Sequence, residues 1–253
     1  MISISKPQKT KVIRKNNNLA IFEIEDLYPG YGNTIGTVLR RVILSSLPGL
    51  AIYRLKIKGV KHEFSAVPYV NENVIDIMLN LKQVRFKANS TKEGESFKGE
   101  IKAKGKKEIK AGDIKLPSEV EVVNPDLLIA TLTDKKSELE LEVEINQGLG
   151  YIPSEQQGRK NITIGVIPMD AIYSPVVRVG FEVESMRVGK RTDFDRLRLE
   201  IETDGTIDPE EAFNQAIDIL HNQLEEIKIE KTEKKNKKSK TKKIRSKKDE
   251  SEE

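Results

Sequence analysis

Three glycines between residues 30 and 36 are the first candidates for chemistry in this sequence. Gly30, Gly32 and Gly36 follow a predicted strand and open a predicted helix, the context in which glycine-rich loops bind dinucleotide phosphates. Their spacing is G-x-G-x-x-x-G, whereas that motif requires G-x-G-x-x-G, and no acidic residue about 20 positions on completes it. We therefore expect these glycines to shape a tight turn and a close helix contact.

Histidines and aspartates give equally weak grounds for catalysis. The chain has two histidines, His62 and His221, and no cysteine, so a zinc site would depend on carboxylates, which is unusual for that ion. Asp193, Asp195 and Asp204 suggest magnesium, but a strand start and a turn explain them as well. The sequence predicts a non-enzymatic chain with no cofactor or metal ion of its own.

Arg40 and Arg41 lie inside the most apolar helical segment of the chain. They could be solvated at the outer edge of that helix. Alternatively, another chain could cover the helix and supply carboxylates or carbonyls, because guanidinium groups suit such interface contacts and burial without a partner is costly. The sequence leaves both interpretations open.

Two long amphipathic helices are predicted, at 34–47 and 209–228. The first carries apolar residues at helical spacing and ends before Pro48. The second begins with Asp208 as N-cap, Pro209 at N1 and Glu211 at N3, a capping-box pattern. Together they carry more apolar surface than one thin sheet needs, which favours a two-fold homodimer. The predicted dimer interface comprises Ile35, Val38, Leu39, Val42, Ile43, Phe213, Ile217, Leu220 and Leu224.

The remaining pattern indicates strands with few, separated helices, which predicts an α+β fold. A third helix is predicted at 73–82. Strands are predicted at 19–24, 51–57, 176–183 and 196–203, with a series of short strands over 84–145.

Charge and hydropathy bound the remaining function classes. Residues 231–253 carry a net charge of +6, which leaves about −2 for the other 230 residues, so a basic globular surface for DNA is not supported. The basic segment has one isoleucine in 23 residues, and we expect it to be disordered. No apolar run is long enough to cross a membrane and the first residues lack a secretory pattern, so a cytoplasmic protein is expected.

Several segments, in order along the chain, resemble the bacterial RNA polymerase alpha subunit. The most specific is GNTIGTVLRRVILSSLPG at 32–49. It is followed by GVKHE at 59–63, IMLNLK at 77–82, GLGYIP at 148–153, DAIYSPV at 170–176, RTDFDRL at 191–197 and ETDGTIDPEEA at 202–212. The resemblance covers about residues 10–228.

The resemblance implies a homodimeric scaffold for polymerase assembly. It implies a discontinuous dimerisation domain at 1–50 and 176–230, a mostly-β insert domain at 51–175, and a disordered Lys-rich tail at 231–253. The partners implied are a second copy of the chain and the beta and beta prime subunits, with the catalytic magnesium ion on a partner chain.

Site residues also follow from the resemblance. Arg41 and Leu44 would contact beta, and Lys82, Met169 and Asp170 would contact beta prime. Family members usually continue into a small DNA-binding domain, whereas this sequence ends in the Lys-rich segment 231–253. That segment is either an inert solvated tail or a weak contact for nucleic acid or acidic proteins.

Overall fold

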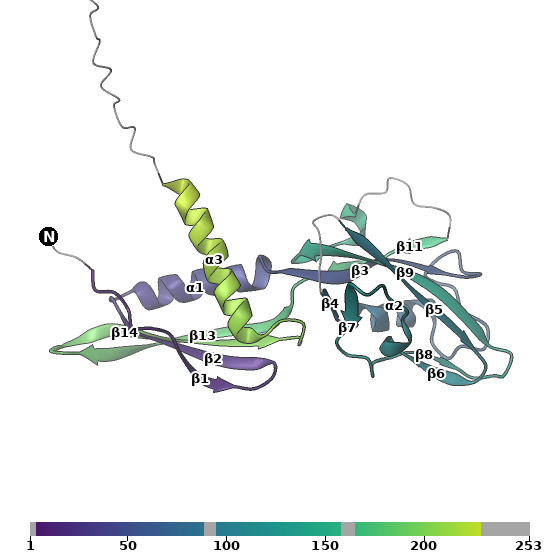
Figure 1. Ribbon diagram of the computed structural model, residues 1–253, viewed down its shortest axis with the longest axis horizontal. Helices are drawn as coiled ribbons and strands as arrows, with labels where there is room; N and C mark the ends of the chain where they lie inside the picture. The colour runs from purple at the N-terminus through teal and green to yellow at the C-terminus, as the bar shows by residue number, and fades with distance from the viewer. Residues whose placement is uncertain (1–3, 89–94, 158–164, 229–253) are drawn as a thin grey trace, which may run out of the picture.

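The chain folds into two lobes that lie side by side, each with its own apolar core (Figure 1). The computed structural model describes residues 4–88, 95–157 and 165–228. The helical lobe is built from residues 11–47 and 176–227, and the insert lobe from the intervening residues 48–172. The predicted tail at 231–253 lies outside the described residues.

A four-stranded antiparallel sheet supports the helical lobe. Its order is β1-β2-β14-β13, and its strands are β1 (Lys11–Lys15), β2 (Leu19–Leu27), β13 (Val176–Val188) and β14 (Arg191–Thr203). Its central pair joins distant segments, because Arg198 of β14 lies opposite Glu23 of β2, 175 positions away in sequence. The predicted strands are extended by this pairing.

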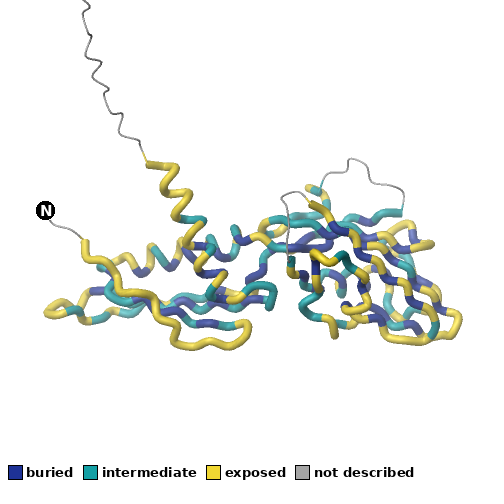
Figure 2. The backbone as a smooth tube through the Cα atoms, viewed as in Figure 1, coloured by how far each residue is buried: buried dark blue, intermediate teal, exposed yellow. Residues whose placement is uncertain are grey.

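Two helices, α1 (Tyr31–Ser45) and α3 (Pro209–Ile227), lie on the same side of this sheet (Figure 1). Each buries one face, as the apolar periodicity predicts. The ring of Phe213 in α3 stacks on that of Phe22 in β2, with centroids 4.6 Å apart. The outer half of α3 projects beyond the sheet, and residues 221–228 are all exposed (Figure 2).

Local signals at the start of α3 are only partly those predicted. The Asp208 carboxylate accepts a hydrogen bond from the backbone N–H of Glu210 at 2.9 Å, which makes Asp208 the N-cap. The Glu211 carboxylate accepts from the Gln215 amide at 3.1 Å, one turn along the helix. The reciprocal half of the predicted capping box is therefore replaced by a contact within the helix.

A six-stranded antiparallel sheet forms the insert lobe. Its order is β5-β9-β3-β4-β7, with β11 pairing to β3. The strands are β3 (Pro48–Ile57), β4 (Phe86–Ala88), β5 (Ser96–Lys104), β7 (Val120–Val122), β9 (Glu138–Leu149) and β11 (Val166–Pro168). Two ribbons accompany it, β6 (Lys107–Lys110) with β8 (Leu128–Leu132) and β10 (Tyr151–Ile152) with β12 (Ala171–Ile172).

The helix of the insert lobe is α2 (Val74–Lys82), close to its predicted range. Asn73 and Asp76 form a reciprocal capping box at its start. Val74, Ile77 and Leu81 face the core of the lobe. With strands as the main component, these three helices of the described chain give the α+β composition that was predicted. None of them is both long and apolar enough to cross a membrane.

One face of the insert sheet is a ladder of opposite charges. Along β9, glutamates at 138, 140, 142 and 144 alternate with buried apolar residues. Basic residues from β3 and β5 lie on both sides of them, as in the pairs Arg54–Glu144 at 3.3 Å and Lys104–Glu138 at 3.0 Å. Each exposed pair adds little stability, but the set favours a single strand register.

Candidate partner-binding surfaces

The glycine turn before α1 binds a carboxylate of the same chain. Gly30 has a φ of 85°, in the left-handed region, and the backbone N–H groups of Gly30 and Gly32 donate to Asp195 Oδ2 at 2.9 and 3.0 Å. In a dinucleotide-binding loop, such amides would bind phosphate. Here Asp195 of β14 takes that position, which supports a structural role for the turn.

Gly32 and Gly36 allow α1 to lie directly on the sheet. A Cβ atom at Gly32 would lie 2.7 Å from Val183 Cγ1, and one at Gly36 would lie 2.7 Å from Phe181 Cδ2. The predicted close helix contact is therefore confirmed. The same anchoring starts the helix at Tyr31, earlier than the predicted start at residue 34.

The three aspartates considered for magnesium serve three different contacts. Asp193 forms an ion pair with Arg191 at 2.8 Å, Asp195 accepts from the glycine turn, and Asp204 pairs with Arg85 at 3.4 Å. Among residues 4–88, 95–157 and 165–228, no three His, Cys, Asp or Glu side chains gather in a way that could hold a metal ion. The prediction that this chain has no cofactor is not tested by these contacts.

An apolar surface runs over the outward sides of α1 and α3. The two helices contact each other, and Val38, Ile217 and Leu224 are 37%, 39% and 54% exposed. Ile35, Val42 and Leu220 are partly buried beside them, and Ile227 is exposed at the end of α3. We call these seven residues the helix surface. Apolar side chains gathered in this way commonly mark a protein–protein contact.

Three residues of the predicted dimer interface belong to the core of the chain itself. Leu39, Ile43 and Phe213 are at most 4% exposed and pack against the sheet of the helical lobe. They face inward because the sheet needs an apolar cover, which the helix stripes supply first. The dimer prediction is therefore corrected to exclude these three residues.

The carboxyl-terminal end of α1 presents Arg41 to solvent. Arg40 and Arg41 are both exposed, and neither forms an ion pair with a described residue. Leu44 is partly buried against the core of the helical lobe. Within one chain the two arginines are thus solvated, and Arg41 remains available to a partner carboxylate.

Lys82 and Asp170, 88 positions apart, form an ion pair on the insert lobe. Lys82 Nζ lies 2.8 Å from Asp170 Oδ2, and the backbone N–H of Ser154 donates to Asp170 Oδ1 at 3.0 Å. The hydrogen bond from Lys82, followed by that from Ser154, lowers the pKa of Asp170 to about 2. The structure therefore brings together two of the three residues assigned to beta prime, as a charged pair fixed in one orientation.

The third residue of that set, Met169, is not on the surface. Its side chain is 1% exposed and belongs to the core of the insert lobe, while its backbone N–H donates to Tyr53 O at 2.9 Å. The side chain of Met169 faces the core, whereas that of its neighbour Asp170 is partly exposed and pairs with Lys82. Met169 is therefore part of the core next to Asp170 and offers no side chain to a partner. The prediction that Met169 contacts beta prime is corrected on this point.

An exposed apolar patch beside this pair was not predicted. Leu149, Tyr151 and Ile172 are 53%, 58% and 39% exposed, and Tyr151 pairs with Ile172 across the β10–β12 ribbon. We call these three residues the ribbon patch. Gly150 lies close to Ser45 O at the end of α1, so the patch links the end of the helical lobe to the Lys82–Asp170 region. The GLGYIP and DAIYSPV segments supply all three residues, but strand pairing was needed to join them.

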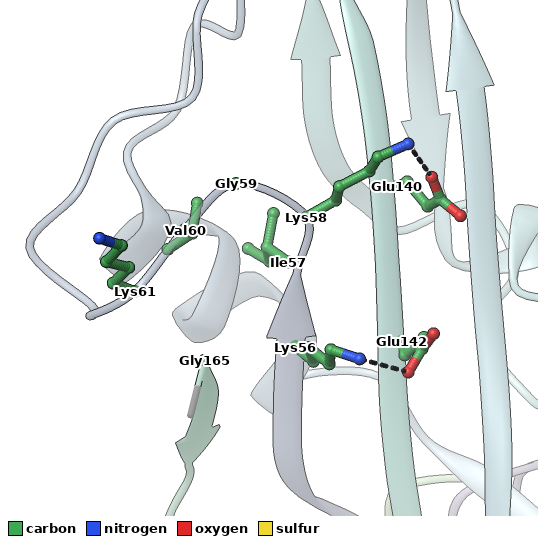
Figure 3. A pocket seen from close by; sticks show the side chains of 9 residues that line it. All are labelled: Lys56, Ile57, Lys58, Gly59, Val60, Lys61, Glu140, Glu142 and Gly165. Atoms are coloured by element: carbon green, nitrogen blue, oxygen red, sulfur yellow. Dashed lines mark hydrogen bonds and ion pairs between the residues drawn. The ribbon is translucent and has the colours of Figure 1, made fainter. Parts of the chain in front are cut away.

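A hollow of the insert lobe lies at the edge of the charge ladder. Its volume is about 500 Å³, and its nine lining residues include Lys56, Lys58, Glu140 and Glu142 (Figure 3). Each of these lysines is paired with a glutamate, at 3.6 Å for Lys56–Glu142 and 2.9 Å for Lys58–Glu140. Both glutamates of the lining are therefore held in ion pairs with lysines on the sheet face. The hollow has the chemistry of a solvated sheet face.

Similarity to known proteins extends over most of the chain. A sequence model of the RNA polymerase Rpb3/RpoA insert domain matches residues 55–174. The DNA-directed RNA polymerase subunit alpha of Symbiobacterium thermophilum is 46% identical over 226 residues, covering 89% of this chain and 70% of the relative. The chain belongs to the RNA polymerase alpha subunit family. Other alpha subunits are 44% identical (Phocaeicola vulgatus, 221 residues) and 45% identical (Syntrophomonas wolfei, 228 residues).

Membership of the RNA polymerase alpha subunit family connects the chain with transcription. The chain covers 66% of the Phocaeicola vulgatus alpha subunit and 71% of the Syntrophomonas wolfei one, or about two thirds of each. The residues that match the insert-domain model run from within β3 to just past β12. In this chain, the insert domain of the family therefore corresponds to the insert lobe.

Proposed function

We propose that the chain is a non-catalytic scaffold of a bacterial RNA polymerase, acting in the cytoplasm. Two copies form a two-fold dimer, and this dimer binds the large subunits beta and beta prime. Nucleotidyl transfer and its magnesium ion belong to those partner chains. The observation that carries the proposal is the helix surface, exposed in a chain whose relatives named above are polymerase alpha subunits.

The dimer follows from the position of α3. Its outer half extends beyond the sheet (Figure 2), and Leu224 and Ile227 on it are 54% and 74% exposed among the described residues. Burying such side chains is favourable by about 25 cal/mol per Å² of apolar area. In a two-fold dimer, the helix surface of one copy packs against the helix surface of the other copy and buries it. The dimerisation domain of the proposal comprises residues 1–50 and 176–230, and residues 51–175 form the insert domain.

The contacts with the large subunits use separate lobes of the chain. Arg41, with Leu44 beneath it, offers an unpaired guanidinium to beta. The Lys82–Asp170 pair offers a fixed donor and acceptor to beta prime. Because Asp170 is held by Lys82 and by Ser154, its carboxylate is already oriented before a partner arrives.

Oligomeric state tests the first part of the proposal. Analytical ultracentrifugation of the full chain should give a dimer, and Leu224→Glu should shift it to a monomer by placing a charge in the helix surface. Leu128→Glu is the matched control, because Leu128 is an exposed leucine of the insert lobe. A monomeric wild-type chain, or a dimer that survives Leu224→Glu, would contradict the two-fold contact.

Co-purification with beta and beta prime tests the second part. Arg41→Ala should remain a dimer and lose beta, while Lys82→Ala should remain a dimer and lose beta prime. Arg40→Ala, one residue away and equally exposed, is the control for Arg41→Ala. If wild type retains neither large subunit, the scaffold proposal is wrong.

A further inference from the structure

The chain passes between the lobes twice, and both passages meet at Tyr173. The first leads from α1 into β3 through Pro48 and Gly49, and the second leads from β12 into β13 through Ser174 and Pro175. Tyr173 is 2% exposed and lies in a small apolar cluster separate from both main cores. The insert-lobe side of the junction thus has a small packed centre of its own, in which Tyr173 is the buried aromatic residue and Tyr53 packs against it.

Two glycines make room for this residue. Gly49 of β3 and Gly148 of β9 lie directly opposite each other in the sheet. A Cβ atom at Gly148 would lie 2.7 Å from Tyr173 Cε2, and one at Gly49 would lie 1.9 Å from Tyr173 O. The ring of Tyr173 therefore lies against the backbone of Gly148, and its carbonyl oxygen lies against that of Gly49. Any side chain at either glycine would clash with Tyr173.

Hydrogen bonds fix Tyr173 at this position. Its hydroxyl donates to Asn146 Oδ1 at 2.7 Å, and its backbone N–H donates to Gly150 O at 2.8 Å. Burial raises the pKa of the Tyr173 hydroxyl, so the group remains a donor at neutral pH. Tyr173 is consequently attached to the end of β9 through its ring, its hydroxyl and its backbone.

An ion pair away from Tyr173 crosses between the lobes. Arg85 Nε, from the insert lobe, lies 3.4 Å from Asp204 Oδ2, which follows β14 in the helical lobe, and the Asp204 side chain is 8% exposed. The backbone N–H of Asp204 donates to Pro175 O at 3.0 Å, which ties it to the second passage. On the other side, the backbone N–H of Arg85 donates to Asn124 Oδ1 at 2.9 Å.

We propose that Tyr173, which fixes the second passage to the insert lobe, and the Arg85–Asp204 pair, which crosses between the lobes, together brace the angle between the lobes. Tyr173 is then a positioning residue for polymerase assembly, an inference that rests on the proposed function. The Arg41 end of α1, assigned to beta, lies on one lobe, while the Lys82–Asp170 pair, assigned to beta prime, lies on the other. Holding both large subunits in one polymerase requires one arrangement of these two sites, and a free hinge between the lobes would add an ordering cost to assembly.

Distance measurements on the isolated full chain test the brace directly. The chain has no cysteine, so Lys136→Cys and Lys190→Cys place one spin label on each lobe at exposed sites. Labelled chain diluted into unlabelled chain reports distances within one copy. Wild type should give one narrow distance distribution by electron paramagnetic resonance. Tyr173→Ala and Asp204→Asn should broaden it, whereas Phe64→Ala, which truncates an exposed aromatic ring of the insert lobe, should not.

Two glycine substitutions test whether the packing of the Tyr173 ring against Gly148 is what holds the angle between the lobes. Gly148→Ala should displace the distance distribution in wild type and have no added effect in a Tyr173→Ala background, because the clashing ring is gone. Gly49→Ala should be disruptive in both backgrounds, because its clash is with the backbone oxygen. Tyr173→Phe, which retains the ring, should remain close to wild type. Equal effects of Gly148→Ala in both backgrounds would contradict the role of the Tyr173 ring.

Capture of beta and beta prime by the same variants tests the positioning role. Tyr173→Ala should remain folded and dimeric but capture the large subunits about tenfold less well, a loss of about 1.4 kcal/mol. Tyr173→Phe, which keeps the ring, should capture the large subunits about as well as wild type. A broad distance distribution with unchanged capture would overturn the positioning role, and narrow distributions in all variants would overturn the brace. If wild type captures neither large subunit, the proposed function and the positioning role fail together, while the distances still decide the brace.

Discussion

Replacing Asp195 with alanine should lower the free energy of unfolding by about 2–4 kcal/mol. The carboxylate accepts two backbone hydrogen bonds, at 2.9 and 3.0 Å, from the first residues of α1. Hydrogen bonds to charged groups contribute about 1.5–3 kcal/mol each, and a helix N-cap about 0.5–2 kcal/mol. These contributions overlap, because the same two bonds form the cap, so the larger sum is not reached. Asp195→Asn retains an acceptor without the charge and should lose about 1 kcal/mol or less.

Chemical denaturation followed by circular dichroism measures this loss. Asp193→Ala is the matched control, because Asp193 is two positions away on the same strand and pairs with Arg191 in solvent, a contact that adds little to stability. We expect the loss of free energy of unfolding to be largest for Asp195→Ala. The losses for Asp193→Ala and Asp195→Asn should be smaller and close to each other. If Asp195→Ala and Asp193→Ala differ by less than about 0.5 kcal/mol, Asp195 does not anchor α1 as argued.

Three further changes follow from the packing and the charges. Gly36→Ala should cost about 1–3 kcal/mol in chemical denaturation because its Cβ would meet Phe181, whereas Gly180→Ala, with open space at its Cβ, should cost nothing. Phe213→Ala should cost about 3–5 kcal/mol by opening a cavity under α3, and a loss below 1 kcal/mol would contradict its core position. The pKa of Asp170, about 2 when folded against 3.8 ordinarily, gives stability that is present above pH 4 and lost as the pH falls towards 2. Asp170→Asn should therefore cost about 1 kcal/mol at neutral pH after solvent screening, and this difference should vanish near pH 2; a constant difference would refute the linkage.

The sequence predicted the start of a helix well where the capping residue lies directly before that helix. Asn73 and Asp208 stand directly before α2 and α3 and hold the first amides of those helices, so both starts were correct within a residue. The start of α1 was predicted late, because its N-terminal amides bind Asp195, 165 positions away. No local pattern announces such a cap, since it exists only after β14 pairs with β2.

The candidate surfaces were harder to predict for the same reason. Periodicity shows that a helix has an apolar face but not which neighbour covers it, so Leu39 and Phe213 were assigned to a partner when their own sheet covers them. Lys82 and Asp170 were named through the family resemblance, but their ion pair depends on tertiary structure. The ribbon patch likewise needed the pairing of Tyr151 with Ile172.

The discontinuous helical lobe has a consequence for synthesis on the ribosome. β2 emerges early, yet its partner β14 lies 175 residues later, which at ordinary elongation rates is a delay of roughly 10–35 s. The insert lobe, by contrast, is contiguous from β3 to β12 and can fold while the chain is still growing. During that interval β2 has β1 as a neighbour but lacks β14, and Phe22 lacks the ring of Phe213 that covers it in the folded chain. We expect nascent chains to hold a folded insert lobe beside an exposed amino-terminal segment that a chaperone would bind.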